Sequence, residues 1–338
     1  MLELKNISYY YNKDGFALNN INIKVNRGSV ACLLGPSGCG KSTILKLIAG
    51  IERPKSGFII ISNKVAVNDH ISLPIEKRNI GFIFQHPTLF PHKTVIENIT
   101  FAIKRCNKEE KYKTALEILD LVNMVSYKDL YPHMLSGGQQ QLITIARTIA
   151  QKPEVVLLDE PFSNMDVILK RKIRKYMLSL FKERNIAALL VTHDPEEALE
   201  VADAIYVARD GSVIQHGTPY DIYYNPKDYE LAKFFGDLNH FHAVAKKNYV
   251  ESPFGKIPIN SQNNNDKVIV CIRPEAILLQ NNGGIQAIVD SVKFFNKMVY
   301  IKIKSYLYLM RFPIALLPNK GDIISVALDL DQVLVFKA

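Results

Sequence analysis

Residues Gly35–Ser42 read Gly-Pro-Ser-Gly-Cys-Gly-Lys-Ser and match the phosphate-loop pattern G-x-x-x-x-G-K-[S/T]. The apolar run Val30–Leu34 precedes this loop, and a helical pattern over Lys41–Ala49 follows it and stops at Gly50. A strand before the loop and a helix after it are the context that the motif requires. The glycines allow backbone N–H groups to surround a phosphate, and the helix dipole strengthens the attraction. The sequence therefore predicts a site for a nucleoside triphosphate.

Apolar runs alternate with helical patterns up to about residue 236. Strands are expected at Ile80–Phe84, Val155–Leu158 and Ala188–Thr192, and helices over Glu109–Val122 and Asp166–Arg184. This alternation predicts an α/β domain. The last of these helices carries basic residues that we expect to form a solvated face: Lys170, Arg171, Lys172, Arg174 and Lys175.

A different pattern begins near His240, where short β-type runs are separated by turn-rich clusters at 260–266, 281–284 and 318–322. This pattern predicts a small all-β domain or barrel. We therefore expect an α/β P-loop NTPase domain over residues 1–236, followed by a small all-β domain over residues 237–338.

The composition excludes several classes of protein. The chain has 338 residues, of which 48% are hydrophobic and 22% charged, so it is neither disordered nor fibrous. No apolar run approaches the roughly 18 residues of a membrane span, and the start lacks the features of a signal peptide. The four cysteines form no C-x-x-C pair, which favours reduced thiols. The net charge of +9 is thinly spread and is compatible with docking beneath an anionic membrane surface.

A second chemical signal is the pair Asp159-Glu160, which directly follows the apolar run Val155–Leu158. An unpaired carboxylate at the end of a core strand is costly, so the pair requires an explanation. With a phosphate loop upstream, Asp159 is placed to hold Mg²⁺ and Glu160 to act as general base for an attacking water. Taken alone, such a pair is as often an ordinary loop feature.

The segment Leu135–Gln139 reads Leu-Ser-Gly-Gly-Gln and precedes a helical pattern. The start of this helix is a second site of the anion-binding type. By itself the segment is equally typical of an N-cap serine followed by two glycines. The helix has an apolar face made of Leu142, Ile145, Ala146, Ile149 and Ala150.

The order of these motifs resembles that of the nucleotide-binding subunits of ABC transporters. That family carries, in order, an aromatic residue that stacks on adenine, the phosphate loop, a glutamine loop, the LSGGQ signature, an acidic strand end, a D-loop and a switch histidine. The resemblance covers the whole first domain and implies an ABC ATPase fold with a helical subdomain. The matching positions are Tyr11, Gly35–Thr43, Gln85, Leu135–Gln139, Asp159 with Glu160, Ser163–Asp166 and His193.

The resemblance implies a role for each matching residue. Catalytic roles are implied for Glu160, His193 and Gln85, and Mg²⁺ binding for Ser42, Gln85 and Asp159. A head-to-tail homodimer is also implied, in which the signature of one chain binds the γ-phosphate held by the other. The implied ATP-binding residues are Tyr11, Gly35, Pro36, Ser37, Gly38, Cys39, Gly40, Lys41, Ser42, Thr43, Ser136, Gly137, Gly138, Gln139 and Asp166.

Some of these residues have simpler explanations when taken singly. Tyr11 lies in a run of three tyrosines that is also typical of strand packing, and His193 precedes Asp194, which is predicted to be a helix N-cap. The chain also departs from the family at two positions. Leu142 replaces the arginine that usually follows the signature, and its place on the apolar face allows packing to absorb the change. Met165 replaces the usual leucine of the D-loop and conserves its volume.

The second domain has a resemblance of its own. Val268–Leu279 resembles the strand and Arg-Pro-Glu segment of the TOBE-type regulatory domains attached to importer ATPases for sugars, polyamines, sulfate and ferric iron. Gly217–Pro226 resembles the region just past the ATPase core of the same subunits. These resemblances imply an ATP-hydrolysing importer subunit, peripheral on the cytoplasmic side of the inner membrane. Its implied partners are a membrane permease and, indirectly, an extracytoplasmic substrate-binding protein.

The flanks of the signature and of the D-loop, including Ser163-Asn164, resemble ferric-iron importers more than the others. None of these residues would touch the cargo, so polyamine, sulfate and sugar stay open as alternatives. A soluble ABC ATPase usually carries coiled-coil insertions or tandem cassettes, and this sequence shows neither. A nucleic-acid-binding β domain is a remote alternative that would use Lys293–Lys304. The alternation in that segment is ordinary for a half-exposed strand, so no nucleic-acid partner is expected.

Overall fold

The structure is a computed structural model that describes residues 1–11, 17–104, 106–163, 165, 167–259, 265–280, 283–313 and 317–338. The chain forms two compact units, Met1–Pro219 and Tyr220–Ala338. The second unit includes two short helices that lie before the predicted domain boundary, α7 (Pro219–Tyr224) and α8 (Tyr229–Phe234). The unit begins at Tyr220, the second residue of α7. The functional boundary between residues 236 and 237 stays a prediction.

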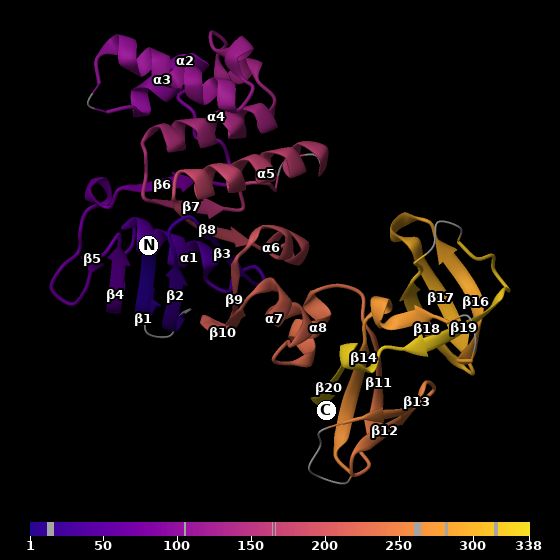
Figure 1. The fold of residues 1–338 in the computed structure, drawn as a ribbon. Helices are drawn as coiled ribbons and strands as arrows, with labels where there is room; N and C mark the ends of the chain where they lie inside the picture. The colour runs from indigo at the N-terminus through magenta and orange to yellow at the C-terminus, as the bar shows by residue number, and fades with distance from the viewer. Residues whose placement is uncertain are drawn as a thin grey trace. The chain divides into compact units, whose positions relative to one another are not determined.

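A six-stranded sheet forms the centre of the first unit, in the order β10-β9-β3-β8-β7-β6 (Figure 1). All neighbours run parallel except β10, which is antiparallel to β9. The four strands predicted from apolar runs are confirmed to within one residue at either end. Parallel strands end at a common edge, so the segments that follow β3, β7 and β8 meet there. The strands are β3 (Val30–Leu34), β6 (Ile80–Ile83), β7 (Val155–Asp159), β8 (Ala187–Thr192), β9 (Ala204–Arg209) and β10 (Ser212–Gly217).

A second, antiparallel sheet has the order β2-β1-β4-β5. Both sheets and helix α1 (Lys41–Ala49) contribute to one apolar core, in which Leu4, Leu33 and Ile44 are at most 1% exposed. This burial anchors the helix that begins at the phosphate loop. The strands of the second sheet are β1 (Leu2–Tyr10), β2 (Ala17–Val25), β4 (Ser56–Ile61) and β5 (Lys64–Val67).

Three helices group together away from β1 and β2 in Figure 1 and form the helical subdomain that the resemblance implies. They are α2 (Val95–Ala102), α3 (Lys108–Leu121) and α4 (Gly137–Ala150), and α4 packs on α2, α3 and β6. Each begins with a capping box, which satisfies backbone donors at its N-terminus. The remaining helices of the first unit are α5 (Val167–Glu183) and α6 (Pro195–Val201).

The second unit is built on antiparallel sheets, which confirms the all-β prediction for the chain from Asn239 onward. Its sheets have the orders β11-β14-β20, β12-β13 and β15-β19-β16-β17-β18. Alternate residues of these strands form a separate apolar core. The strands are β11 (Asn239–Val244), β12 (Tyr249–Ser252), β13 (Gly255–Pro258), β14 (Lys267–Ile272), β15 (Ile277–Leu279), β16 (Ile285–Lys293), β17 (Met298–Ile303), β18 (Tyr306–Arg311), β19 (Ile323–Leu328) and β20 (Val333–Lys337).

The Arg-Pro-Glu segment after β14 explains why α7 groups with this unit. Arg273 is 1% exposed, donates to the backbone oxygen of Tyr223 at 2.7 Å, and lies over the Tyr223 ring at 3.6 Å from its centroid. The Tyr223 hydroxyl donates to Glu275, and burial together with this hydrogen bond raises the pKa of Tyr223 to about 12. The segment therefore fastens α7 to the β-sheets.

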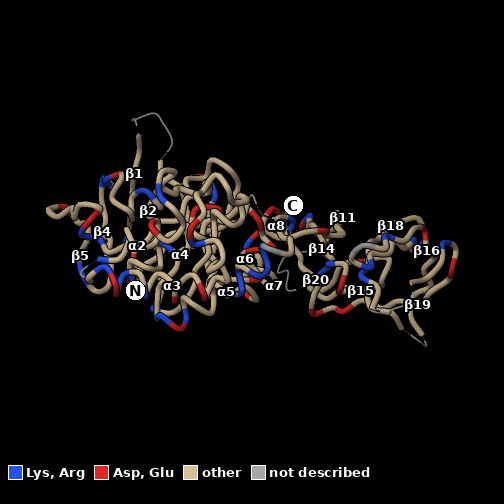
Figure 2. Tube along the Cα trace, turned by 90° about the horizontal axis from the view of Figure 1, so that it is seen from above, with Lys and Arg blue, Asp and Glu red and all other residues tan. Residues whose placement is uncertain are grey.

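Basic and acidic residues are interspersed along the described trace (Figure 2), in keeping with a thinly spread net charge. The Lys293–Lys304 segment forms the end of β16 and all of β17. In β17, buried Val299, Ile301 and Ile303 alternate with the more exposed Tyr300 and Lys302. This is the pattern of a half-exposed strand.

Candidate functional site

The phosphate loop connects the end of β3 to the start of α1, as the motif requires. Gly40 is the N-cap of α1 and has φ of 101°, a left-handed conformation that favours glycine. A Cβ on Gly35 would lie 2.3 Å from the backbone oxygen of Ala208, so only glycine fits there. The glycines at these two motif positions are therefore demanded by backbone geometry as well as by phosphate binding.

Lys41 folds back across the loop that precedes it. Its side chain is buried, at 6% exposure of the residue, and its ammonium group donates to the backbone oxygens of Gly35 and Pro36, both at 2.8 Å. These two carbonyls satisfy a cation that is otherwise held away from water. The arrangement keeps a positive charge at the centre of the loop, where a phosphate would be held.

Ser42 and Asp159 meet across the same edge. The Ser42 hydroxyl donates to Asp159 Oδ1 at 3.1 Å, and Asp159 is the last residue of β7. Burial raises the pKa of the Asp159 carboxyl, with a further contribution from the neighbouring Glu160, while Ser42 and Lys41 oppose the shift. A bound cation would favour the ionised carboxylate. Hydroxyl and carboxylate oxygens are the ligands that Mg²⁺ prefers, so this pair fits a magnesium site.

Glu160 and His193 are brought together by the parallel strands β7 and β8. The His193 Nδ1 and Glu160 Oε1 atoms lie 3.0 Å apart, which fits a hydrogen bond from imidazole to carboxylate. Glu160 has φ of 44°, and its backbone N–H donates to the oxygen of Val191 at 3.1 Å. The Glu160 side chain is 21% exposed and that of His193 is 58% exposed. Both are therefore accessible to a ligand at this edge.

The signature segment forms the start of α4. Ser136 is its N-cap: the Ser136 hydroxyl accepts from the Gln139 backbone N–H at 3.3 Å, and the Gln139 side chain accepts from the Ser136 backbone N–H at 2.9 Å. A Cβ on Gly137 would meet nothing within 4 Å. The ordinary N-cap explanation is thus correct for Ser136, and the exposed backbone beside it is also open to a ligand.

The other predicted site residues are less constrained by the structure. Tyr11 is 52% exposed, and its ring meets the Tyr9 ring edge-on at 5.0 Å between centroids. Gln85 is exposed just after β6. Of the predicted D-loop, Asn164 and Asp166 lie outside the described residues. The site that the structure assembles is therefore the phosphate loop with Asp159, Glu160 and His193.

One residue that connects the signature helix to the segment of Gln85 was not identified from the sequence. Gln141 on α4 is 3% exposed, and its amide donates to the backbone oxygen of Phe84, directly before Gln85, at 3.2 Å. Its place one turn before Ile145, on the apolar face, was the available signal. Leu142 is 9% exposed, so the replacement of the usual arginine is accommodated by packing as expected.

The prediction of a fully solvated basic face on α5 was wrong for two residues. Arg174 is 6% exposed, and Lys170 donates to Asp194 at 3.2 Å. The reason is that acidic residues along α6 and at its N-cap Asp194 lie against this side of α5, as the ion pairs of Arg174 with Glu197 and Glu200 show.

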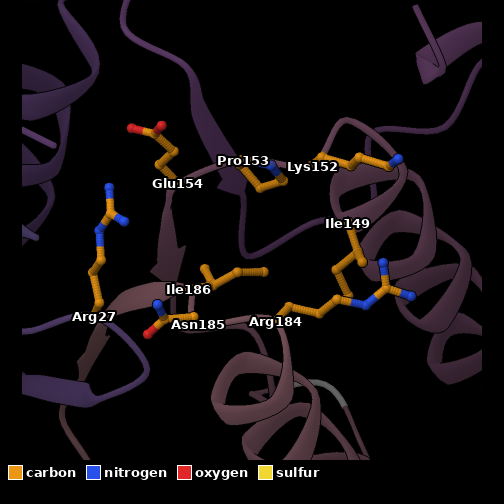
Figure 3. A pocket seen from close by; sticks show the side chains of 8 residues that line it. All are labelled: Arg27, Ile149, Lys152, Pro153, Glu154, Arg184, Asn185 and Ile186. Carbon is orange, nitrogen blue, oxygen red and sulfur yellow. The ribbon is translucent and has the colours of Figure 1, made fainter.

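A cavity of about 340 Å³ lies elsewhere in the first unit. In Figure 3, Lys152 and Arg184 lie on one side of it and Arg27 and Glu154 on the other. Lining residues directly precede β7 and β8, so the cavity lies at the amino ends of these strands and is distinct from the phosphate-loop edge. It is lined by Arg27, Ile149, Lys152, Pro153, Glu154, Arg184, Asn185 and Ile186.

Comparison with known proteins shows which family the chain belongs to. The ABC transporter family model matches residues 18–163. The Fe(3+) ions import ATP-binding protein FbpC of Photorhabdus laumondii is 39% identical over 288 residues, which cover 84% of this chain and 81% of that protein. The chain belongs to the ABC transporter family. Its phosphate loop, Asp159, Glu160 and His193 thus lie in an ABC ATPase cassette.

Two other similarities concern an importer subunit and a solved cassette. The spermidine/putrescine import ATP-binding protein PotA of Oleidesulfovibrio alaskensis is 39% identical over 82% of this chain and 76% of its own length. A dimeric structure of the ATP-binding cassette MJ0796, described as a post-hydrolysis state bound to ADP and Pi, has a TM-score of 0.57 and 32% identity. It covers 65% of this chain and 99% of that one. The similarity to the solved ABC cassette confirms the predicted fold class.

The raised pKa of Asp159 makes a testable prediction about stability. In the unfolded chain the Asp159 carboxyl has the ordinary pKa of 3.8, and in the folded chain its pKa is higher. As the pH rises from the unfolded pKa through the folded pKa, the unfolded chain loses this proton first, so the free energy of unfolding without nucleotide decreases. We expect Asp159→Asn, which keeps an acceptor for Ser42, to melt above the wild type at pH 7, with the difference narrowing toward about pH 4. The same variant should lose most of the thermal stabilisation that Mg–ATP gives. A variant less stable than the wild type at pH 7 without nucleotide would contradict this reasoning.

Proposed function

We propose that this chain is the ATP-binding and ATP-hydrolysing subunit of an ABC importer. The contact between Glu160 and His193, 3.0 Å apart and beside the phosphate loop, is the observation that carries this proposal. It supplies a carboxylate base and a polar imidazole at the edge where Lys41, Ser42 and Asp159 converge. The similarity to import ATP-binding proteins over more than four-fifths of the chain supports the importer role.

In the proposed reaction, a carboxylate oxygen of Glu160 accepts a proton from water as the water oxygen bonds to the γ-phosphorus. The bond from that phosphorus to the β–γ bridging oxygen breaks, which releases ADP and phosphate. Lys41 exchanges its carbonyl partners for phosphate oxygens and offsets their charge. His193 orients the γ-phosphate beside Glu160. Ser42, Asp159 and Gln85 would hold Mg²⁺, which supplies charge neutralisation to the phosphates when bound.

The signature segment is proposed to act on a second chain. Ser136 and Gly137 are exposed at the start of α4, where backbone N–H groups favour an anion. A head-to-tail homodimer would place this segment against the γ-phosphate held by the partner's phosphate loop, with Asp166 near the same interface. The similarity to MJ0796, whose structure with ADP and Pi is dimeric, supports a dimer of the present chain.

We further propose that a separate permease holds the subunit at the cytoplasmic face of the inner membrane. No helix in the described part of the chain is long and apolar enough to cross a membrane. The segment after Gln85 offers a docking surface, since Phe101 is 62% exposed and its ring meets that of Phe90 edge-on at 4.9 Å between centroids. An extracytoplasmic binding protein would deliver the cargo to the permease.

The roles of Glu160 and Lys41 can be separated by mutation. We expect Glu160→Gln to retain ATP binding but to slow hydrolysis by about two to four orders of magnitude, because the amide accepts no proton. Lys41→Ala is expected instead to weaken nucleotide binding itself. Measurement of ATPase turnover and of nucleotide affinity for both variants checks the assignment, and wild-type turnover in Glu160→Gln would show that another group is the base.

Ferric iron is the proposed cargo, with polyamine and sulfate as alternatives that have similar relatives of their own. Relatives named for Fe(3+) import and for spermidine/putrescine import reach the same 39% identity, so similarity alone does not separate them. The Ser163-Asn164 pair and the flanks of the signature favour iron. The cargo passes through the permease and touches none of the residues described here.

A deletion strain tests iron against polyamine as the cargo. We expect it to grow poorly when iron is limiting, to contain less cellular iron, and to recover when the gene is returned, but not when the returned gene carries Glu160→Gln. An unchanged iron requirement together with a defect in polyamine uptake would replace iron by polyamine.

A further inference from the structure

A buried arginine lies beneath the switch-histidine segment. Arg174, on α5, is 6% exposed. Its Nη1 donates to Glu200 Oε2 at 2.6 Å, and its Nη2 lies 3.1 Å from Glu197 Oε1. The phosphate-loop mechanism uses none of these three residues. The burial of Arg174 and Glu197 therefore needs an explanation of its own.

The arginine is linked to both neighbours of His193. Glu197, which is 4% exposed, accepts a hydrogen bond from the Thr192 hydroxyl at 2.5 Å. That hydroxyl in turn accepts from the backbone N–H of Asp194 at 3.1 Å. Thr192 and Asp194 flank His193 in the chain, so its backbone is held on each side by a network that ends on Arg174.

The same guanidinium group also reaches the segment that carries Glu160. It lies 5.5 Å from the centroid of the Phe162 ring, and Phe162 is 3% exposed two residues after Glu160. Glu160 has a left-handed backbone, which surrounding contacts must maintain. One side chain thus supports the segments of both Glu160 and His193.

The network is poorly satisfied for a purely stabilising device. Within the described residues, the buried Arg174 Nε has no hydrogen-bond partner, and the buried Glu197 Oε1 is balanced by the ion pair with Arg174 Nη2 alone. A buried ion pair is weak evidence for stability, because apolar residues of similar volume often stabilise a fold as well or better. A charged group that joins the segments of Glu160 and His193 is better explained by a need to hold these two segments in a fixed position.

We propose that Arg174 is a positioning residue that keeps Glu160 and His193 in contact for ATP hydrolysis. The inference rests on the proposed function, since it assumes catalytic roles for both partners. In this role Arg174 acts through Thr192, Glu197 and Phe162 and not by contact with the reacting groups. Because α5 follows the predicted D-loop directly, a displacement of this helix would reach the Glu160–His193 pair through Arg174.

The test measures steady-state ATP hydrolysis by the purified full-length chain. We expect Arg174→Met to lower kcat about ten- to a hundredfold while KM for ATP changes less than about threefold, because misplacement of the reacting groups leaves the phosphate loop intact. On a His193→Ala background the same substitution is expected to cause a smaller fold loss in kcat than on the wild type, since the part of its effect that passes through that histidine is already absent. Arg171→Met, an exposed position on the same helix, is the matched control and should leave kcat unchanged.

Three results would overturn the inference. They are a wild-type kcat in Arg174→Met, a loss expressed in KM alone, and equal fold losses with and without His193. If Arg174→Met does not fold, Arg174→Met with Glu197→Gln removes the unpaired carboxylate and keeps an acceptor for Thr192. That double variant is expected to fold and still to hydrolyse ATP slowly, and recovery of wild-type kcat would mean that Arg174 serves stability only.

Failure of the proposed function is recognised separately. If Glu160→Gln hydrolyses ATP at the wild-type rate, the proposed base is wrong and the inference falls with it. If Glu160→Gln is impaired while Arg174→Met is not, the proposed function stands and only the role of Arg174 is rejected.

Discussion

The arrangement of the site depends on the parallel pairing of β7 with β8. In this register Asp159 lies opposite Val191, and the Glu160 backbone N–H donates to the Val191 oxygen at 3.1 Å. The pairing carries the acidic strand end to within hydrogen-bond distance of His193. Because side chains alternate along a strand, a shift of one residue would turn them to the other face and separate the pair.

Charged groups near this edge are held at a cost, and each has a compensating contact. Lys41 is held by two loop carbonyls, Asp159 by the Ser42 hydroxyl, and Glu197 by Arg174 and Thr192. Removing one partner of a buried charge would destabilise the fold by about 3–5 kcal/mol. Burial raises the pKa of the Asp159 carboxyl in spite of the Ser42 and Lys41 contacts, so these contacts offset only part of the cost of burying its charge. A cation bound at Asp159 would favour the ionised carboxylate.

Much of this arrangement could be predicted from the sequence because it is local. The strands around the phosphate loop are continuous apolar runs, and the motif residues lie at strand ends, where chain order alone indicates that they converge. Arg174 could not be assigned in this way. Its helix carries five basic residues within six positions, and only tertiary packing selects the one that meets Glu197. The grouping of α7 with the second unit likewise depends on the contact between Arg273 and Tyr223, fifty residues apart.

The central claim is that this edge is one half of an ATPase site whose other half is the signature of a second chain. Its most direct test is the ATPase activity of a mixture of Lys41→Ala and Ser136→Arg chains. In a head-to-tail dimer each site combines the phosphate loop of one chain with the signature of the other. The mixed dimer then has one site that carries both the Lys41 and the Ser136 defects and a second site that is intact. The account predicts that the mixture hydrolyses ATP faster than either variant alone. Activity no higher than that of the separate variants would contradict the shared site.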